Sequence, residues 1–187
     1  MSRVKLYNEK EVLEKAMNLF WRNGYNVTSM QMLEKEMGIN KFSIYSSFGS
    51  KDLLLQESVK CYAEKLNKIV EKLQNSSGGI ASLKQYFYDF VEFSKEDELA
   101  KGCLITNTAN EVIKTNNPEI SDLLRKYTVD VRDVFANKIR QIRASDEQEV
   151  QEKADYLIIA MFGFSSATKI FSKDQLENYI KNIFENI

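Results

Sequence analysis

The sequence predicts an all-α protein of about nine helices, with a small N-terminal unit of three helices and a larger C-terminal helical bundle. One Pro and seven Gly in 187 residues favour long uninterrupted helices, because these two residue types most strongly oppose helix interiors. Apolar residues recur three and four positions apart, and no useful length alternates as a half-buried strand would.

The first two helices are predicted from their capping signals. Asn8 with Glu11 three positions later predicts a capping box at the start of the first helix, and Gly24 predicts its end. Thr28 with Gln31 predicts a second box, which would begin the second helix.

The third helix follows a tight turn at Gly38-Ile39. Asn40 is expected to cap this helix, which ends near Phe48. Ile44 and Phe48 lie four positions apart, enough to hold one face of a two-turn helix inward. The second and third helices therefore have the dimensions of a helix-turn-helix.

Six further helices are expected after the first three. The chain is expected to divide into a first domain over residues 1–51 and a second over residues 52–187. Each boundary rests on a capping residue, a Pro at the first helical position or a Gly-rich break. The fourth helix is expected from Ser50 to about Gln74, followed by the linker NSSGG at 75–79 and a fifth helix over about 81–95. The sixth is expected to start at Gly102-Cys103, and the seventh to run from Asn117-Pro118 to about Arg143. The eighth is expected from Ser145 with Gln148 to about Phe171, and Ser172 with Gln175 marks the start of the ninth.

The composition excludes several kinds of chemistry. His is absent, which removes His-based acid–base catalysis, Ser-His-Asp triads and His-containing metal sites. Cys61 and Cys103 lie in separate segments without a CxxC spacing, so no zinc site is expected. Together with the lack of any clustered Asp/Glu motif, this predicts neither an enzyme nor a cofactor.

No segment is expected to enter a membrane. The longest apolar run, YLIIAMFGF at 156–164, has half of the roughly 18 to 20 residues that a membrane-spanning helix needs. The start of the chain has no apolar segment of signal-peptide type. A cytoplasmic protein is therefore expected.

The outward face of the third helix is the first candidate binding surface. With Ile44 and Phe48 turned inward, Lys41, Phe42 and Tyr45 face outward together with the small Ser46. Lys can bond the acceptor edge of guanine, and Phe can pack on a thymine methyl. The alternative reading is that the polar residues are only caps and that Tyr45 is a half-buried filler.

Charge also favours this N-terminal region as a nucleic-acid surface. Residues 1–51 carry eight Lys or Arg against five Asp or Glu, a balance of +3, although the whole chain has −1. A local basic face can meet phosphate whatever the charge elsewhere. Lys51 at the start of the fourth helix adds a cation and backbone N–H donors suited to phosphate.

Residues 12–54 resemble the N-terminal domain of the TetR family of transcriptional regulators. The residues that carry the resemblance are Ala16, Leu19-Phe20, Gly24-Tyr25, Thr28-Ser29, Gly38-Ile39, Lys41, Tyr45, Phe48, and Ser50-Lys51 with Leu53-Leu54. The resemblance implies a homodimer on a double-stranded operator of two half-sites, acting as a repressor that an effector releases. Two positions depart from the family pattern: Phe42 replaces a small residue, and Glu34 replaces a small apolar one.

The resemblance also implies roles for individual side chains. Phosphate contacts are expected from Thr28, Tyr45, Ser47 and Lys51. Base contacts are expected from Gln31, Lys41, Phe42, Ser43 and Ser46.

The last two helices are the expected dimer interface. The eighth is apolar nearly all round at 156–164, more than one chain can bury. The ninth adds an apolar face from Leu176 to Ile187. Two such helices from each chain would form a four-helix interface; the alternative is that they cover the core of a single chain.

Cys103 is a candidate sensor. With Gly102 as the cap, it is expected in the first turn of the sixth helix, where the partial positive charge favours a thiolate. The stretches at 102–112 and 165–171 are similar to a TetR branch that senses electrophiles and oxidants through a thiol, and Lys169 matches a Lys of that branch near the Cys. On the face shared with Phe162, Lys169 is expected to point into the core. The alternative for Cys103 is a small buried hydrophobe.

A small-molecule effector is the other expected trigger, with an aromatic-lined pocket suited to a hydrophobic or planar molecule. The candidate lining residues are Tyr62, Phe87, Phe90, Thr106, Asn110, Tyr127 and Phe162. A helical protein-interaction module without DNA binding, using Phe42 and Tyr45, is the remaining alternative function.

Overall fold

The computed structural model describes the chain except residues 1–6, 95–100, 113–116, 143–145 and 186. Within the described part every regular element is a helix, which confirms the all-α prediction. These helices are α1 (Glu9–Asn23), α2 (Met30–Met37), α3 (Lys41–Phe48), α4 (Lys51–Asn75), α5 (Ile80–Ser94), α6 (Leu104–Val112), α7 (Pro118–Ile142), α8 (Glu147–Ala167) and α9 (Lys173–Glu185).

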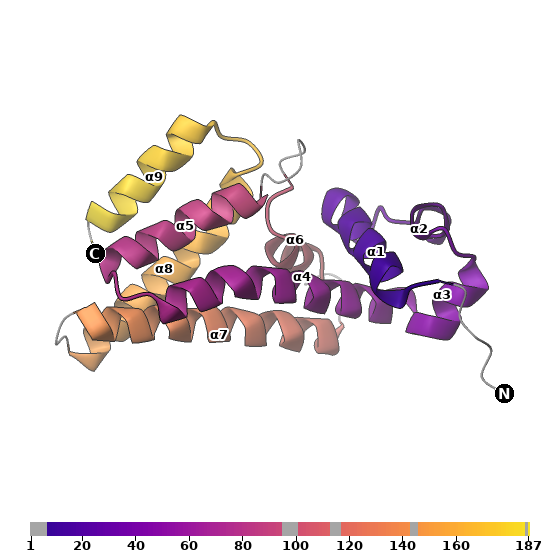
Figure 1. The fold of residues 1–187 in the computed structure, drawn as a ribbon, viewed down its shortest axis with the longest axis horizontal. Helices are drawn as coiled ribbons and strands as arrows, with labels where there is room; N and C mark the ends of the chain where they lie inside the picture. Colours follow the sequence, from indigo (N-terminus) through magenta and orange to yellow (C-terminus); the bar gives the residue numbers. More distant parts are fainter. Residues whose placement is uncertain (1–6, 95–100, 113–116, 143–145, 186) are drawn as a thin grey trace.

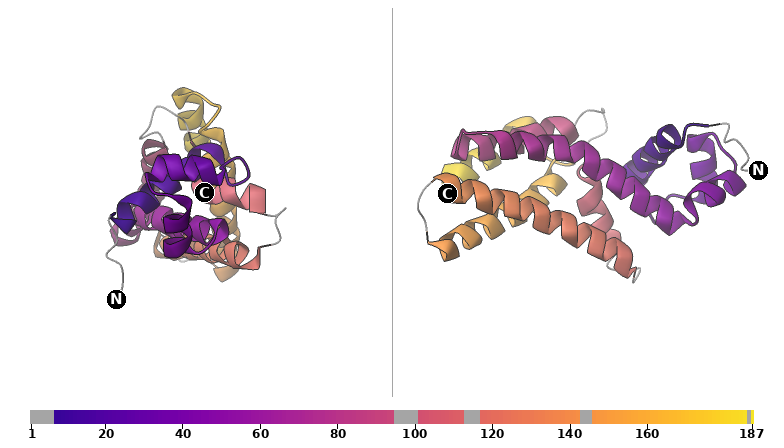
Figure 2. Two further views of the ribbon diagram at one scale, coloured as in Figure 1. Left: turned by 90° about the vertical axis from the view of Figure 1, so that its right-hand side faces the viewer. Right: turned by 60° about the horizontal axis from the view of Figure 1, so that its bottom comes forward.

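The molecule is elongated, and α4 connects its two parts. Figure 1 shows α1, α2 and α3 grouped at one end and α5, α8 and α9 at the other, with α4 and α7 running side by side. Figure 2 shows the same two groups when the molecule is turned. α4 has 25 residues, about 38 Å at 1.5 Å per residue. No helix of the described residues combines the length and apolarity needed to cross a membrane.

The predicted N-caps of α1, α3 and α4 are confirmed, although Glu11 accepts from the side-chain amide of Asn8, at 3.2 Å, where a capping box would use the Asn8 backbone N–H. The side chains of Asn8, Asn40 and Ser50 accept backbone N–H groups at the starts of α1, α3 and α4. At α2 the cap is Ser29, whose Oγ accepts from the Met32 N–H at 3.2 Å. The predicted box of Thr28 with Gln31 is therefore wrong, because α2 begins one residue later than that box requires.

Two boundaries farther along the chain also differ from the sequence prediction. α6 begins at Leu104, so Cys103 lies just before the helix, with its carbonyl accepting the Asn107 N–H at 2.9 Å. α8 ends at Ala167 and not near Phe171. The predicted markers Ser145 and Arg143, and residue 95 at the end of the fifth helix, lie outside the described residues. The α9 box is confirmed, with reciprocal Ser172–Gln175 bonds of 3.0 and 3.4 Å.

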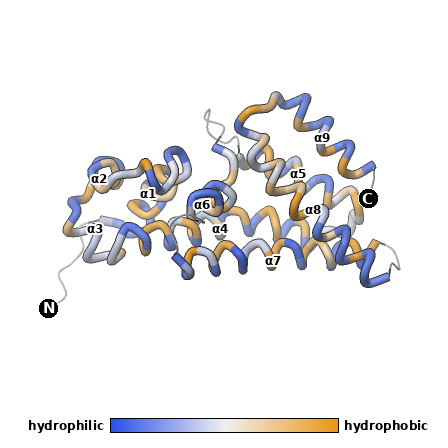
Figure 3. Tube along the Cα trace, turned by 180° about the vertical axis from the view of Figure 1, so that it is seen from behind, coloured by the Kyte–Doolittle hydropathy of each residue, from blue (hydrophilic) through white to orange (hydrophobic). Residues whose placement is uncertain are grey.

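One hydrophobic core runs through both parts of the molecule. Figure 3 shows hydrophobic and hydrophilic residues alternating along α4 and α7, as amphipathic helices require. In the bundle the core centres on Phe87, which is fully buried. Its ring meets four other aromatic rings with centroids 5.3 to 6.4 Å away: Tyr86, Phe135, Phe164 and Phe184.

Phe87→Ala is expected to destabilise the fold by about 3–5 kcal/mol, because it removes a buried ring and leaves a cavity among the four neighbouring rings. Urea unfolding followed by circular dichroism measures this change. Gln85→Ala, at an exposed site of the same helix, should change the free energy of unfolding by no more than about 0.5 kcal/mol. Equal losses for the two variants would contradict the placement of Phe87 in the core.

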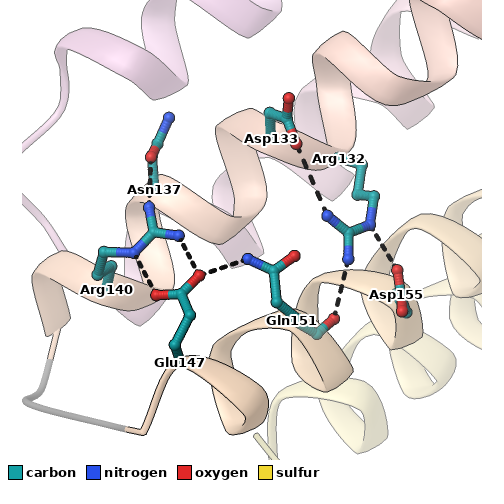
Figure 4. A network of polar contacts seen from close by, with 7 residues as sticks. All are labelled: Arg132, Asp133, Asn137, Arg140, Glu147, Gln151 and Asp155. Carbon is teal, nitrogen blue, oxygen red and sulfur yellow. Dashed lines mark hydrogen bonds and ion pairs between the residues drawn. The ribbon is translucent and has the colours of Figure 1, made fainter.

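Polar contacts fix the pairing of α7 with α8 (Figure 4). Arg140 of α7 donates to both carboxylate oxygens of Glu147 at 3.0 and 2.7 Å, and Arg132 pairs with Asp155 at 2.5 Å. The bonds from Arg140 and from Gln151 lower the pKa of Glu147 to about 2. Because Arg140, Glu147 and Asp155 are exposed, the network sets the register of the two helices more than it adds stability.

Candidate functional site

α3 is held to the molecule by one face only. Ile44 is fully buried, and Phe48 is half-buried against the core. On the opposite face Phe42 is 77% exposed and Tyr45 is 40% exposed. Lys41 is exposed beside Tyr45, with its Nζ 5.7 Å from the centre of the Tyr45 ring. The exposure that the predicted base and phosphate contacts require is therefore present at these side chains and at Ser46.

The turn between α2 and α3 explains the unusual glutamate. Gly38 ends α2 with a φ of +71°, a conformation that glycine adopts without a steric penalty. Glu34 Oε1 accepts the backbone N–H of Lys41 at 2.5 Å, at the first residue of α3. Glu34 thus replaces the small apolar packing residue with a carboxylate at the positive end of α3, where it stabilises the helix.

Tyr7 is a contact of α3 that the sequence did not predict. Its hydroxyl lies 2.7 Å from Ser47 Oγ and donates to the Ser43 carbonyl at 3.3 Å. Both serines are half-buried. Tyr7 precedes the α1 cap and has no periodic partner, so only its tertiary contacts with α3 reveal its role.

Thr28 does not lie where its predicted role requires. Its side chain is fully buried, and its hydroxyl donates to the Gly24 carbonyl at 2.6 Å. A phosphate contact of this hydroxyl is at odds with that burial. The exposed side chains at the start of α2 are Ser29 and Gln31.

Lys51 is partly engaged within the protein. Its ammonium donates to the Tyr25 carbonyl at 2.7 Å and lies 4.1 Å from the centre of the Tyr25 ring. Burial lowers the pKa of Lys51. Burial and the hydrogen bond that Tyr25 donates to Asp52 raise the pKa of Tyr25 to about 12. Since an ammonium has three donors, Lys51 both fixes the α1–α2 turn and keeps donors for a phosphate.

A small cavity lies in the bundle beside Cys103. Its volume is about 30 Å³, room for one or two waters and far below the roughly 300 Å³ of a typical ligand pocket. Five of the predicted effector residues line it: Cys103, Phe90, Thr106, Tyr127 and Phe162. Thr106 and Ser165 are joined across one side of the cavity, with Ser165 Oγ donating to Thr106 Oγ1 at 2.9 Å.

The other four predicted effector residues do not line this cavity. Phe87 is part of the aromatic core, and Asn110 is exposed on α6. Tyr62 is fully buried beside Cys103. Lys169 is exposed and donates to Asn107 Oδ1 at 2.5 Å. The prediction that Lys169 points into the core is wrong. α8 ends before Lys169, so the helical face that the prediction assumed does not extend to this residue.

Three tyrosine hydroxyls surround Cys103. Burial is the main cause that raises the pKa of Tyr62, Tyr86 and Tyr127, and in each case Cys103 adds to the shift. The hydroxyls of Tyr62 and Tyr127 are buried without a hydrogen-bond partner of normal geometry in the described part of the chain. The cavity therefore combines the Cys103 thiol with the unpaired Tyr127 hydroxyl in an apolar setting.

The exposed second helix of a helix-turn-helix, carried on a separate helical bundle, defines the class of helix-turn-helix DNA-binding regulators. The chain belongs to the tetR family of bacterial regulatory proteins. The family model matches residues 12–58, and the model of the tetracyclin repressor-like C-terminal domain matches residues 79–181. The protein is thus a DNA-binding transcriptional regulator and not an enzyme, as the sequence predicted.

Similar proteins agree with this assignment. The uncharacterized HTH-type transcriptional regulator YezE of Bacillus subtilis is 30% identical over 164 residues, 87% of this chain and 83% of YezE. IcaR of Staphylococcus aureus, the negative regulator of the biofilm operon icaADBC, is 26% identical over 141 residues, 75% of this chain and 76% of IcaR.

Solved structures share the fold. A cysteine mutant of the TetR family regulator CifR, complexed with 26-bp double-strand operator DNA, has a TM-score of 0.84 at 22% identity, covering 98% of both chains. The reduced form of Escherichia coli NemR has a TM-score of 0.79 at 19% identity, covering 95% of both chains.

Proposed function

We propose that the protein is a repressor that binds an operator of two half-sites as a homodimer, through residues 1–51, and that residues 52–187 dimerise and receive an effector. The observation that carries the proposal is the free face of α3, which presents Lys41, Phe42 and Tyr45 together. Repression is supported by the relative IcaR, which is named a negative regulator. We propose a cytoplasmic location, which is where a bacterial regulator meets its operator DNA.

The proposed contacts divide into two groups. Base contacts come from Gln31, Lys41, Phe42, Ser43 and Ser46, and phosphate contacts come from Tyr45, Ser47 and Lys51. The apolar ring of Phe42 in place of a small residue favours a thymine methyl in the half-site. The bond between Ser47 and Tyr7 holds the Ser47 hydroxyl at the edge of the same surface.

The proposed dimer interface centres on α8. Its outer face carries Tyr156, 47% exposed, and Ile159, 70% exposed. The next residue on this face is Gly163, where an added Cβ would meet no atom within 4 Å. We propose that α9 joins α8 in this interface, although its residues Leu176 and Ile180 are buried against their own chain.

Salt dependence tests the proposal against the alternative of a protein-interaction module. Fluorescence anisotropy with DNA from upstream of the protein's own gene should show tight, saturable binding that weakens steeply as salt rises, because bound Lys and Arg displace counterions from DNA. Competition with unrelated DNA should be weak by comparison. Binding that is absent, or equal for unrelated DNA, would contradict an operator-binding role.

We propose modification of the Cys103 thiol as one trigger of release, because the thiol lies beside the buried hydroxyls of Tyr62 and Tyr127 and a cavity too small for a ligand of ordinary size. An added group there would exceed the available space and force α6 or its preceding segment to move. A small-molecule effector would need the same cavity to widen.

Cys103→Ser is expected to abolish release of operator DNA by an electrophile such as N-ethylmaleimide, while leaving binding to the operator within about twofold, since Ser is nearly isosteric. The matched control is Cys61→Ser on α4, which should keep the full response. Anisotropy before and after the reagent measures both. An unchanged response in Cys103→Ser would rule out sensing through this thiol.

A further inference from the structure

Hydrogen bonds at two places join the DNA-binding helices to the segment around α6, and the Lys101 ammonium lies 4.9 Å from the centre of the Trp21 ring. Trp21 of α1 donates its indole N–H to the Gly102 carbonyl at 3.1 Å. In the turn after α1, the backbone N–H of Asn26 donates to Glu111 Oε2 at 2.9 Å, and its side-chain amide donates to the same oxygen at 3.1 Å. The partners lie 81 and 85 residues apart in sequence, so no local pattern imposes these contacts.

Both links pass close to a glycine with a positive φ. At Gly24, a Cβ would lie 2.1 Å from Glu111 Oε1. At Gly102, a Cβ would lie 2.5 Å from Lys169 Cε and 3.0 Å from the Ser165 carbonyl. Their φ angles of +77° and +67° also favour glycine. Backbone limits the space only at Gly102, through the Ser165 carbonyl, whereas at both glycines the positive φ is what a substitution would strain.

One amide ties the Gly102 junction to the bundle. Asn107 of α6 donates to the Lys101 carbonyl at 2.9 Å and accepts from Lys169 at 2.5 Å. The 101–103 segment, α6 and the turn after α8 are thus tied together. Cys103, at the end of this segment, lines the small cavity. A movement of Cys103 at the cavity would therefore shift Gly102, whose carbonyl accepts the indole N–H of Trp21.

The geometry gives these links a specific mechanical role. α1 and α3 otherwise pack on α4, while α6 meets α1 beside α4 (Figure 1). A group of helices attached to one long helix can still tilt about it. A second attachment away from that helix fixes the tilt.

We propose that Glu111 and Trp21 are positioning residues, which set the angle of α1–α3 relative to the bundle and make that angle depend on the state of the 101–103 segment. The inference rests on the proposed operator binding and names the regulation of that site. In a dimer, a change of this angle alters the spacing of the two α3 helices. The coupling therefore runs through α6 and α1 as well as along α4.

The reactivity of Cys103 provides a test that needs no effector. With Cys61→Ser as the parent, Cys103 is the one remaining thiol, and its alkylation by iodoacetamide reports how often the buried 101–103 segment opens. Coupling between two sites is reciprocal. Saturating operator DNA should therefore slow alkylation, by about 5-fold or more for coupling of typical strength. DNA on α3 cannot shield Cys103 directly, since the thiol is buried inside the bundle.

Two variants at one position separate the hydrogen bonds from the charge. Glu111→Ala removes both, and the ratio of alkylation rates without and with operator should fall toward one. Glu111→Gln loses the same charge but keeps an oxygen that accepts from Asn26, and it should retain most of the ratio. Glu92→Ala, an exposed glutamate of α5, is the control and should match the parent.

The alkylation ratios of these variants decide whether Glu111 positions the DNA-binding helices. A parent-like ratio in Glu111→Ala, an equal loss in the Gln and Ala variants, or a parent whose alkylation ignores bound operator would each overturn the positioning role. Operator binding is measured separately by anisotropy. A parent that fails to bind operator at all would instead refute the proposed function, and this inference with it.

Discussion

Lys41→Ala combined with Tyr45→Ala is expected to abolish operator binding, with a loss of at least about 100-fold in affinity. Both side chains lie on the free face of α3 and support one another through a cation–π contact. A good base contact contributes about 1–3 kcal/mol of discrimination, and a symmetric dimer loses each contact twice. Anisotropy with operator DNA measures the loss.

The fold should survive this double change. Tyr45 is 40% exposed and Lys41 lies at the first residue of α3, so neither supports the core. Thermal unfolding and sedimentation should match the unmodified protein. Lys68→Ala on an exposed site of α4 removes one charge away from α3 and should retain binding within a few-fold. Tight operator binding by the double variant would refute the assignment of α3 as the recognition helix.

Ile159→Lys is expected to convert the dimer into folded monomers. The side chain is 70% exposed in one chain, so lysine is tolerated there by the monomer. In an apolar interface the same lysine is a buried charge without a partner, which costs on the order of 3–5 kcal/mol. Sedimentation equilibrium should report the 21.7 kDa of a single chain.

Loss of the dimer should also weaken operator binding, by about 10²-fold or more, because two linked half-sites bind far more tightly than one. The matched control is Val129→Lys, a β-branched residue of α7 that is 47% exposed on another face. It should remain dimeric and bind DNA. A dimeric Ile159→Lys protein would show that the chains associate through a different surface.

Local sequence patterns were sufficient for the helices and for the free face of α3. Asn40 caps α3 and Ile44 anchors it, and both follow from residues within one or two turns of each other. The same reasoning failed at the start of α2, where either of two adjacent residues could cap the helix. Thr28 and Ser29 are both good caps, and the choice of Ser29 depends on the buried contact of Thr28 with Gly24.

By itself the sequence determined an all-helical regulator with a recognition helix near its start, because helical periodicity and capping depend on residues that are close together in the sequence. Only the tertiary structure decided what surrounds Cys103, which face of α8 stays uncovered, and that Glu111 binds Asn26. These features join residues tens of positions apart. They depend on how several helices pack together, and no local pattern encodes that packing.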